Sequence, residues 1–388
     1  MKNKIIIAGC GLSGMITALS LAHYGLESII IEKKNTNNDD FFNDVRTTAL
    51  TSTTKNFFKE INIWSEISTI TRNINDIYVV DNKSDDMLHF QSPTFKKEKL
   101  NPEPMGHIVE NNIFKKTLLN IVLNSKQISL IDNINYILNK NDEIGCSLIL
   151  GDGRELLADL LIICDGFNSS LKQNYFNNII QKNYDQCAIT FLVNHKNQHD
   201  GTAVEHFMPN GPFAILPLKD SNTSSVVWTV KHEMKEMLMA CQSDEFTYII
   251  KENFGKFLGD INIISEVKAF PLKACVTKNY YNQNIVVLAD SAHIIHPLAG
   301  QGLNQGIKDI KSLIINILEH NFNKEMFINY EKDRLIDNIM MFEITDKLNS
   351  LFSHNLPISK LLRKFGFKSI ERISPLKNLL VNYAMGIR

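Results

Sequence analysis

Three closely spaced glycines near the start of the chain have the pattern that brings a backbone against a diphosphate. The run Gly9-Cys10-Gly11-Leu12-Ser13-Gly14 follows the β-branched stretch 4–8 and precedes an apolar segment. In such a turn the first glycine permits the bend, the second lets the backbone approach the phosphates, and the third lets helix and strand pack. The helix start then offers free N–H groups to the anion. The run predicts a dinucleotide site formed by Gly9, Gly11, Leu12, Ser13 and Gly14.

A carboxylate follows where the sugar of such a dinucleotide would lie. Glu32 comes eighteen residues after Gly14, at the end of a second β-branched run over residues 28–31. A carboxylate at this point of a strand–helix–strand unit accepts hydrogen bonds from ribose hydroxyls. We therefore add Glu32 and its neighbour Lys33 to the predicted site. These residues alone do not distinguish FAD from NAD.

A second motif, Asp165-Gly166, comes directly after the apolar run 159–164. An Asp-Gly pair at the end of a strand is equally typical of a simple turn without a ligand. The residues themselves leave both interpretations open.

The third motif is the most informative. An apolar run over 284–289 ends at Asp290, which can bind a sugar-like hydroxyl, and a loop with Gly300, Gln301 and Gly302 follows. A helix is expected from about Leu303, and its start presents positive backbone dipole to an electron-rich ring system. His293 and His296 in this stretch have the spacing of a metal pair, but no third ligand is nearby. We therefore predict no metal site.

Composition narrows the class of protein. The 388 residues carry a formal net charge of -1, with 44% hydrophobic and 21% charged residues, which is typical of a soluble globular protein. Nothing in this balance favours a nucleic-acid partner. The six cysteines are scattered, so we expect buried thiols in a reducing, cytoplasmic compartment. No apolar run approaches the roughly 18 residues of a membrane span, and the glycines in the first apolar stretch argue against a secretory signal.

The elements that must position these motifs form an α/β fold. Residues 4–32 predict a strand–helix–strand opening, with the helix over 15–24 and Gly25 at its end. A further helix is expected over 48–66, and Gly151-Asp152-Gly153 predicts a hairpin turn. Strand-like runs over 186–272 predict a mostly antiparallel sheet inserted into the nucleotide-binding unit.

The predicted organisation is a Rossmann-like dinucleotide-binding domain, a mostly antiparallel substrate-binding sheet domain and a C-terminal helical region. We expect the first from residues 1–75, 105–185 and 273–322, the second from 76–104 and 186–272, and the third from 323–388.

The three motifs, in this order and spacing, resemble the class A flavoprotein monooxygenases. The chain is most similar to the hydroxylases of ubiquinone biosynthesis, the UbiH/UbiF/UbiI group, and the resemblance covers essentially its whole length. The block 292–304, Ala-His-Ile-Ile-His-Pro-Leu-Ala-Gly-Gln-Gly-Leu-Asn, is specific enough to separate this group from most other flavoproteins. Similar stretches occupy 44–50, 108–111, 211–218 and 384–386.

The resemblance implies FAD as the cofactor. It places the FAD diphosphate at the N-terminal glycines, the adenosine ribose at Glu32 and the flavin side of FAD at Arg46. Asp290 is implied to bind the ribityl or diphosphate portion, and Asp165 with Gly166 to serve both FAD and NAD(P)H. The flavin-facing loop would supply Pro297, Gly300 and Gln301 as catalytic positions, with cofactor contacts from Gly300, Gly302, Leu303 and Asn304.

Two positions depart from the family pattern. Ala289, before Asp290, is usually glycine, and Lys172, at the end of the second motif, is usually arginine. A lysine lacks the planar fork of arginine, which weakens its assignment as a phosphate clamp.

The implied reaction is hydroxylation of the aromatic ring of a polyprenylated phenol in ubiquinone biosynthesis. NAD(P)H would act as a transient reductant, and O2 would supply the inserted oxygen atom through a flavin C4a-hydroperoxide. The chain has one G-x-G-x-x-G, so no second nucleotide domain is expected. The alternatives are a hydroxylase of a small soluble aromatic and a non-catalytic FAD-binding scaffold that assembles other ubiquinone-biosynthesis proteins. The intact glycines and acidic residues argue against the scaffold.

The inserted sheet is expected to bind the substrate ring and its tail. The candidates for these contacts are Phe207, Phe213, Leu216, Pro217 and Trp228. Each of them is also a typical residue of a hydrophobic core.

The tail 360–388 holds seven basic residues and one acidic residue among apolar side chains. One interpretation is a solvated helix face. The other is peripheral contact with anionic lipid at the inner face of the membrane, or with a partner protein.

Overall fold

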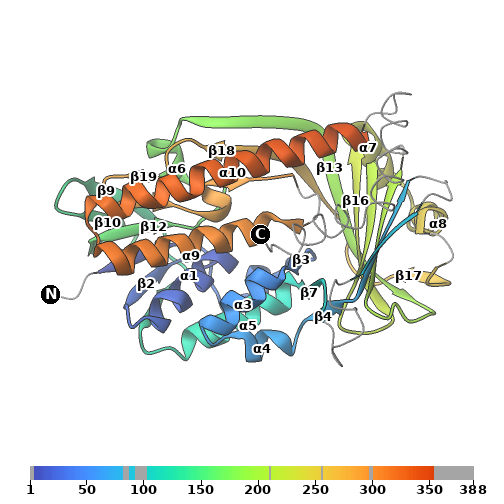
Figure 1. Cartoon of the computed structure of the whole chain (residues 1–388), viewed down its shortest axis with the longest axis horizontal. Coiled ribbons are helices and arrows are strands. Elements are labelled where there is room, and N and C mark those ends of the chain that lie inside the picture. Colours follow the sequence, from blue (N-terminus) through green and yellow to red (C-terminus); the bar gives the residue numbers. More distant parts are fainter. Residues whose placement is uncertain are drawn as a thin grey trace.

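The computed structural model describes residues 4–81, 87–91, 103–208, 211–254, 257–296 and 300–353. Two sheet-based units lie side by side along the long axis, and a long helix runs over both (Figure 1). Pro297 and the tail 360–388, both singled out from the sequence, lie outside the described residues.

A six-stranded sheet forms the centre of the first unit. Its strand order is β19-β20-β12-β1-β2-β8, and every neighbouring pair is parallel except β19–β20. The inner strands are almost fully buried, as expected for parallel strands covered on both faces. The strands are β1 (Ile5–Ala8), β2 (Ser28–Ile31), β8 (Ile128–Ile131), β12 (Leu160–Ile163), β19 (Tyr281–Asn282) and β20 (Ile285–Val287).

Helices and two small sheets complete this unit. The helices are α1 (Leu12–His23), α2 (Asp39–Phe42), α3 (Ser52–Glu60), α4 (Trp64–Ser68), α5 (Asn111–Leu123), α6 (Ser170–Tyr175) and α9 (Gly302–His320). One small sheet pairs β3 (Thr47–Leu50), β7 (Gly106–Glu110) and β4 (Arg72–Ile74). The other pairs β11 (Glu155–Ala158), β10 (Cys146–Leu150) and β9 (Tyr136–Asn141). The predicted strand–helix–strand opening and the Gly151–Gly153 hairpin turn are confirmed.

The helix expected over 48–66 is wrong at its start, and it is divided into α3 and α4, because α3 ends at Glu60. Residues 47–50 form β3, which pairs with β7, and the helix begins only at Ser52. Thr51 ends the strand and caps the helix, because its hydroxyl accepts a hydrogen bond from the Thr54 N–H at 3.3 Å. Consecutive threonines favour this strand, since β-branched side chains fit a pleated surface better than a helix.

A larger sheet forms the second unit. Its main order is β21-β18-β13-β16-β15-β14-β5-β6, with β17 beside β13, and its pairs are antiparallel except β14–β5. The strands are β5 (Asp76–Asp81), β6 (Met87–Gln91), β13 (Ile179–His195), β14 (Thr202–Met208), β15 (Gly211–Pro217), β16 (Thr223–Lys231), β17 (Ile261–Ile263), β18 (Lys268–Thr277) and β21 (His293–Ile294).

The two faces of the large sheet have different surroundings. One face is covered by α7 (His232–Ala240) and α8 (Ser243–Phe254), and a second hydrophobic core fills the space between these helices and the sheet. Its other face meets the small β3-β7-β4 sheet through a third cluster that includes Ile108, Ala203 and Leu218.

The two units are tied together by long elements. Strands β13 and β18 pair from Ile179↔Thr277 to Thr190↔Lys268 and run from one unit into the other (Figure 1). Helix α10 (Lys324–Ser353) packs along them, with Phe342 against Ala274 and Val276. None of the described helices is long and apolar enough to cross a membrane.

Candidate functional site

The N-terminal glycine turn leaves no room for side chains at two of its three glycines. Gly9 has φ +105°, and a Cβ there would lie 2.8 Å from the Asp165 backbone. A Cβ on Gly14 would lie 2.0 Å from the Gly9 carbonyl oxygen, so α1 can approach β1 only without it. Both glycines are therefore required by the fold itself.

The middle glycine has the opposite environment. A Cβ on Gly11 would meet nothing within 4 Å, so the space beside it is open. Gly11 is also the N-cap of α1 and provides no side chain to accept the first N–H groups of the helix, those of Leu12 and Ser13 among them. An open approach and uncapped amides at a helix start suit a diphosphate. The residues present therefore fit the FAD that the sequence implies.

Glu32 holds this turn in shape. One carboxylate oxygen accepts from the Cys10 N–H at 2.7 Å and the other from the Lys34 N–H at 2.9 Å. Lys33 points instead toward the second motif, since its ammonium lies 5.0 Å from the centre of the Tyr136 ring. Tyr136 in turn donates to Asp165 Oδ2 at 3.4 Å.

The second and third motifs meet at one hydrogen bond. Gly166, at φ +86°, donates its N–H to the Ser291 hydroxyl at 2.9 Å. Burial raises the pKa of the neighbouring Asp165 carboxyl, and the hydroxyl of Ser169 and the charge of Lys33 partly oppose that effect. The turn after β12 is thus more than a chain reversal, because it joins the glycine turn to the Asp290 turn.

Asp290 lies in the short helical turn η2 (Ala289–Ser291). Its side chain is exposed, yet the protein packed around its base raises the pKa of the carboxyl, against the opposing charges of His293 and Arg46. Arg46, the residue before β3, is close enough for its charge to act on Asp290. Its guanidinium binds both oxygens of Asp44, at 2.8 and 2.7 Å, and lies 5.2 Å from the centre of the Phe270 ring.

The described part of the flavin-facing loop is fastened to β3. Gly300 has φ +61°, and a Cβ there would lie 3.2 Å from Ala49 Cβ. Asn304 is buried, and its amide donates to the carbonyl oxygens of Ala49 and Gly300 at 2.7 and 3.1 Å. Its oxygen accepts from the Thr51 N–H and the Thr54 hydroxyl. The Asn304 side chain is therefore occupied in holding the loop. Gln301 and Leu303 lie just before Asn304 in the sequence, at the start of α9.

Sequence reasoning missed the buried ionic network that supports η2. Asp309 on α9 accepts from the Ala289 N–H at 2.9 Å and contacts His293 Nε2 at 2.6 Å. Its other oxygen accepts from Arg334 Nε on α10 at 2.8 Å and from the Asn338 amide at 3.0 Å. The positive charges of His293 and Arg334 hold the pKa of Asp309 well below its usual range despite its burial. No local motif marks Asp309, because its partners are distant in sequence.

Lys172, the departure from the family pattern, is buried. Its ammonium lies 4.7 Å from the centre of the Phe167 ring and has no hydrogen-bond acceptor among the described residues. Burial lowers the pKa of Lys172, and nearby Lys273, 3.4 Å from the same ring centre, adds to the decrease. An unsatisfied ammonium beside the second motif leaves a donor for an anionic group.

The five predicted substrate residues divide between the two faces of the large sheet. Phe213 and Trp228 are fully buried in the core against α7 and α8, so they do not reach the face that meets β3. Pro217 is buried at the end of β15. Leu216 packs in the cluster that contains Ala49, and Phe207 lies on the same face by strand alternation. Sequence periodicity shows that alternate residues share a face, but not which face is covered by helices.

We call the side that meets the small sheet the β3-side face. It carries Ala203, Glu205, Phe207, Ala214, Leu216 and Val227, of which all but Ala203 are partly exposed. It adjoins β3 directly, since the Thr47 hydroxyl donates to the Ser225 hydroxyl at 3.2 Å.

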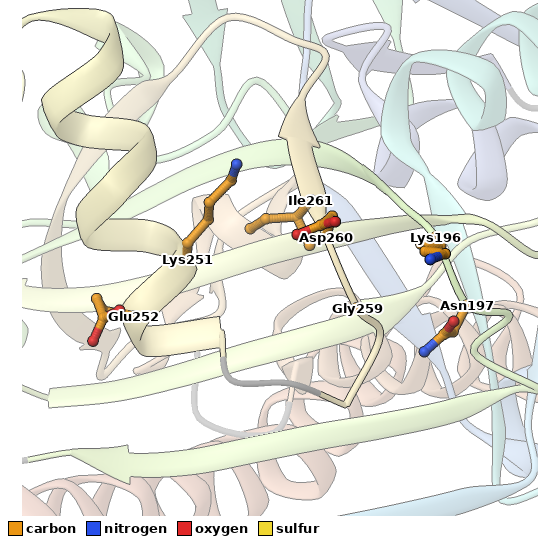
Figure 2. A pocket seen from close by; sticks show the side chains of 7 residues that line it. All are labelled: Lys196, Asn197, Lys251, Glu252, Gly259, Asp260 and Ile261. Carbon is orange, nitrogen blue, oxygen red and sulfur yellow. The ribbon is translucent and has the colours of Figure 1, made fainter.

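A surface hollow of about 480 Å³ lies far from these motifs, between α8 and β17. Figure 2 shows that its charged side chains do not converge: Lys251 and Glu252 extend in different directions, and Lys196 lies apart from both. This arrangement does not build a site. No group of three metal-ligating side chains occurs among the described residues.

Comparison with known proteins matches this geometry. A family model described as an FAD binding domain matches residues 2–335. The ubiquinone hydroxylase UbiL of Rhodospirillum rubrum is 30% identical over 98% of this chain and 89% of that protein. The 3-demethoxyubiquinol 3-hydroxylase of Escherichia coli is 27% identical over 99% and 98% of the two chains. A mitochondrial ubiquinone biosynthesis monooxygenase of Dictyostelium discoideum is 27% identical over 98% and 91%.

Solved structures share the fold at low identity. The p-nitrophenol 4-monooxygenase PnpA of Pseudomonas putida superposes with a TM-score of 0.80, at 13% identity over 100% of this chain and 99% of that one. PqsL of Pseudomonas aeruginosa, a probable FAD-dependent monooxygenase, gives 0.75 at 16% identity over 90% and 96%.

Proposed function

We infer that this chain, which belongs to the FAD-binding-domain family that includes the ubiquinone hydroxylases, is an FAD-dependent monooxygenase of ubiquinone biosynthesis. Its substrate is a polyprenylated phenol, and the reaction inserts one oxygen atom from O2 into the ring. The order and spacing of the three motifs first indicated this family, and the matches over almost the whole chain confirm it.

One observation carries the conclusion: the three motifs converge. The Gly9 backbone packs against Asp165, and Gly166 bonds to Ser291 beside Asp290. The segments come from three distant parts of the chain, and each ends a neighbouring parallel strand, where open α/β sheets bind their ligands.

The described residues can divide the cofactor between them. Gly11 and the start of α1 would bind the FAD diphosphate, Glu32 the ribose, and Asp290 the ribityl chain. Bound FAD would supply electron transfer from a reduced nicotinamide and the activation of oxygen. Asn304 contributes indirectly, by fixing the Gly300 loop against β3 so that the loop stays in place.

The substrate would lie against the β3-side face. Ala214 and Val227 are apolar, partly exposed and adjacent across β15 and β16, so they offer a ring a flat apolar surface. NAD(P)H would bind transiently, since the chain has one G-x-G-x-x-G.

The decisive experiment is expression of the chain in bacterial strains that each lack one ubiquinone hydroxylase, with quinone intermediates profiled by mass spectrometry. We expect restoration of ubiquinone in at least one strain, which also identifies the ring carbon that is hydroxylated. Restoration in none of them, from a protein that is purified with FAD, would contradict the proposed substrate.

The cellular location is a separate proposal: a cytoplasmic protein with peripheral contact at the inner face of the membrane through residues 360–388. The support is the basic and apolar composition of that segment and the lipid-like substrate. Flotation with vesicles of anionic lipid should carry the full chain, and removal of 360–388 should abolish it. Equal flotation of both forms would contradict the proposal.

A further inference from the structure

One acid stands alone on the β3-side face. Glu205, in the middle of β14, pairs with Ala214 on one side and Val79 on the other, so its cross-strand neighbours are apolar. No hydrogen bond or ion pair joins its carboxyl to another described residue. His206, the next residue on β14, lies on the opposite face. On the face of Glu205, Asp81 pairs with Phe207 one row further along, and Lys268 pairs with Thr190 at the far end of the same row.

Alternation along β14 fixes the face on which this carboxyl lies. Val204 packs in the core against α7 and α8, whereas Ala203 packs in the cluster that contains Ala49. Glu205 therefore shares the face of Ala203, one pleat further along. Ala49 in turn touches the Gly300 loop, because a Cβ on Gly300 would lie 3.2 Å from Ala49 Cβ.

Successive rows of this face lead toward the predicted flavin position. Ser225, in the row of Ala203, bonds to Thr47. Arg46, the residue before Thr47, lies over the Phe270 ring. Phe270 pairs with Ala188, which lies two rows beyond the row of Ala203. The row between contains Glu205, Ala214, Val227 and Thr190. A ring placed on Ala214 and Val227 would therefore have Glu205 at its edge.

We propose that Glu205 is the catalytic base that accepts the phenolic proton of the substrate. This inference rests on the proposed function and adds a residue to it. Electrophilic oxygen transfer requires an electron-rich ring, and a phenolate is richer than a phenol. The phenol O–H bond breaks, its proton binds a Glu205 oxygen, and its electron pair stays on the ring oxygen and is delocalised into the ring.

The remaining atoms balance with reactants that the proposed function already supplies. O2 is the oxidant and NAD(P)H the reductant, and one oxygen atom enters the ring while the other leaves as water. The hydrogen displaced from the ring carbon is lost as a proton. Glu205 returns its proton to the same ring oxygen, so the carboxylate is restored for the next turnover.

The environment of Glu205 suits this role. Glu205 is partly exposed, but desolvation by the protein packed around it, in the absence of a charged partner, raises the pKa of its carboxyl to about 8. A base with a pKa near 8 is well matched to a phenol, whose ordinary pKa is about 10.

The test uses the full chain loaded with FAD and a prenylated methoxyphenol as the probe, with Glu205→Gln, Glu205→Asp and the control Glu236→Gln. Glu236 is an exposed acid on α7, so its substitution removes the same charge elsewhere in the domain. The rate of hydroxylation is measured across pH, and the reduction of FAD by NAD(P)H is measured separately. Product and hydrogen peroxide are then measured during turnover.

In the wild type and the control, we expect the rate of hydroxylation to rise with pH with a midpoint near 8, because the carboxylate form of Glu205 is the base. In Glu205→Gln this rise should disappear and hydroxylation should fall about 100-fold, with FAD content and FAD reduction unchanged. Glu205→Asp should keep a rise of the rate with pH. A wild-type rate and pH profile in Glu205→Gln would overturn the proposal alone. A wild type that neither binds nor hydroxylates the probe would overturn the proposed function as well.

Discussion

At the scale of single residues, Ala289 shows the physical consequence of a departure from the family pattern. It has φ +52°, in the left-handed region that glycine adopts freely, and its Cβ faces Gly306 closely. An alanine in this region is strained by about 1–2 kcal/mol. The methyl group that Ala289 has in place of the usual glycine therefore carries a conformational cost at the turn that holds Asp290.

We predict that Ala289→Gly increases the free energy of unfolding by about 0.5–1 kcal/mol, since relief of strain exceeds the added entropy of the unfolded chain. Urea unfolding followed by circular dichroism measures it. Ala292→Gly is the matched control, because Ala292 ends the same turn at φ -91° and should lose stability. A loss in both variants would show that the turn is unstrained at Ala289.

A second residue-scale feature is the buried imidazole of His107. Neither ring nitrogen has a hydrogen-bond partner among the described residues, and the ring packs edge-on against Trp64. Burial, with repulsion from Lys55, lowers the pKa of His107 from 6.5 to about 4. The folded protein thus holds this histidine neutral where the unfolded chain would protonate it.

This depressed pKa predicts acid sensitivity. The stabilising contribution is complete above pH 6.5 and is lost as pH falls toward 4, because the unfolded state binds the proton first. The difference corresponds to about 3 kcal/mol. Unfolding of His107→Phe should depend less on pH between 7 and 4 than that of the wild type. His23→Phe, at an exposed position, should leave the pH dependence unchanged. Parallel pH profiles for His107→Phe and the wild type would contradict this assignment.

At the scale of elements, the β1–α1 turn separates two kinds of glycine. Gly14 is required for α1 to pack on β1, whereas Gly11 borders open space. The same sequence pattern therefore contains a folding constraint and a binding constraint, which the motif alone does not separate.

Substitution by alanine should distinguish them. Gly11→Ala should fold like the wild type without cofactor yet bind FAD at least about tenfold more weakly, because its methyl group occupies the space the diphosphate needs. Gly14→Ala should unfold at lower temperature even without FAD. Thermal unfolding and flavin fluorescence titration measure the two effects. Normal FAD affinity in Gly11→Ala would place the diphosphate elsewhere.

At the scale of the whole molecule, α10 connects both units to the Asp290 turn. Arg334 on this helix bonds to Asp309, and Asp309 accepts from the Ala289 N–H. Further along, Phe342 packs on β18, which continues into the large sheet. The position of η2 therefore depends on a helix that follows every motif in the sequence.

Removal of the Arg334 guanidinium should destabilise the folded protein. Arg334→Met should lower the free energy of unfolding by about 3–5 kcal/mol, because it removes the guanidinium that bridges the buried carboxylates of Asp309 and Asp337. It should also weaken FAD binding. The exposed neighbour Lys332→Met is the control and should change neither. Unchanged stability in Arg334→Met would mean that the network is already compensated by other groups.

The sequence by itself determined the nucleotide-binding opening, the family and the cofactor. Those features are local: a glycine turn between a strand and a helix needs particular residues at fixed spacing, and Gly9, Glu32 and Gly166 could be located from neighbours alone. The helix expected over 48–66 failed at its first residues because pairing of β3 with β7 overrides local helix propensity.

Only the tertiary structure decided which side of the large sheet faces the cofactor unit. Alternation places Phe213 and Leu216 on opposite faces, but the packing of α7 and α8 buries Phe213 and leaves Leu216 on the β3-side face with Glu205. The network around Asp309 was equally hidden, since its partners are brought together by helix packing. Spacing along a chain specifies local geometry, whereas the burial and pairing of a charge depend on elements that meet only in the folded protein.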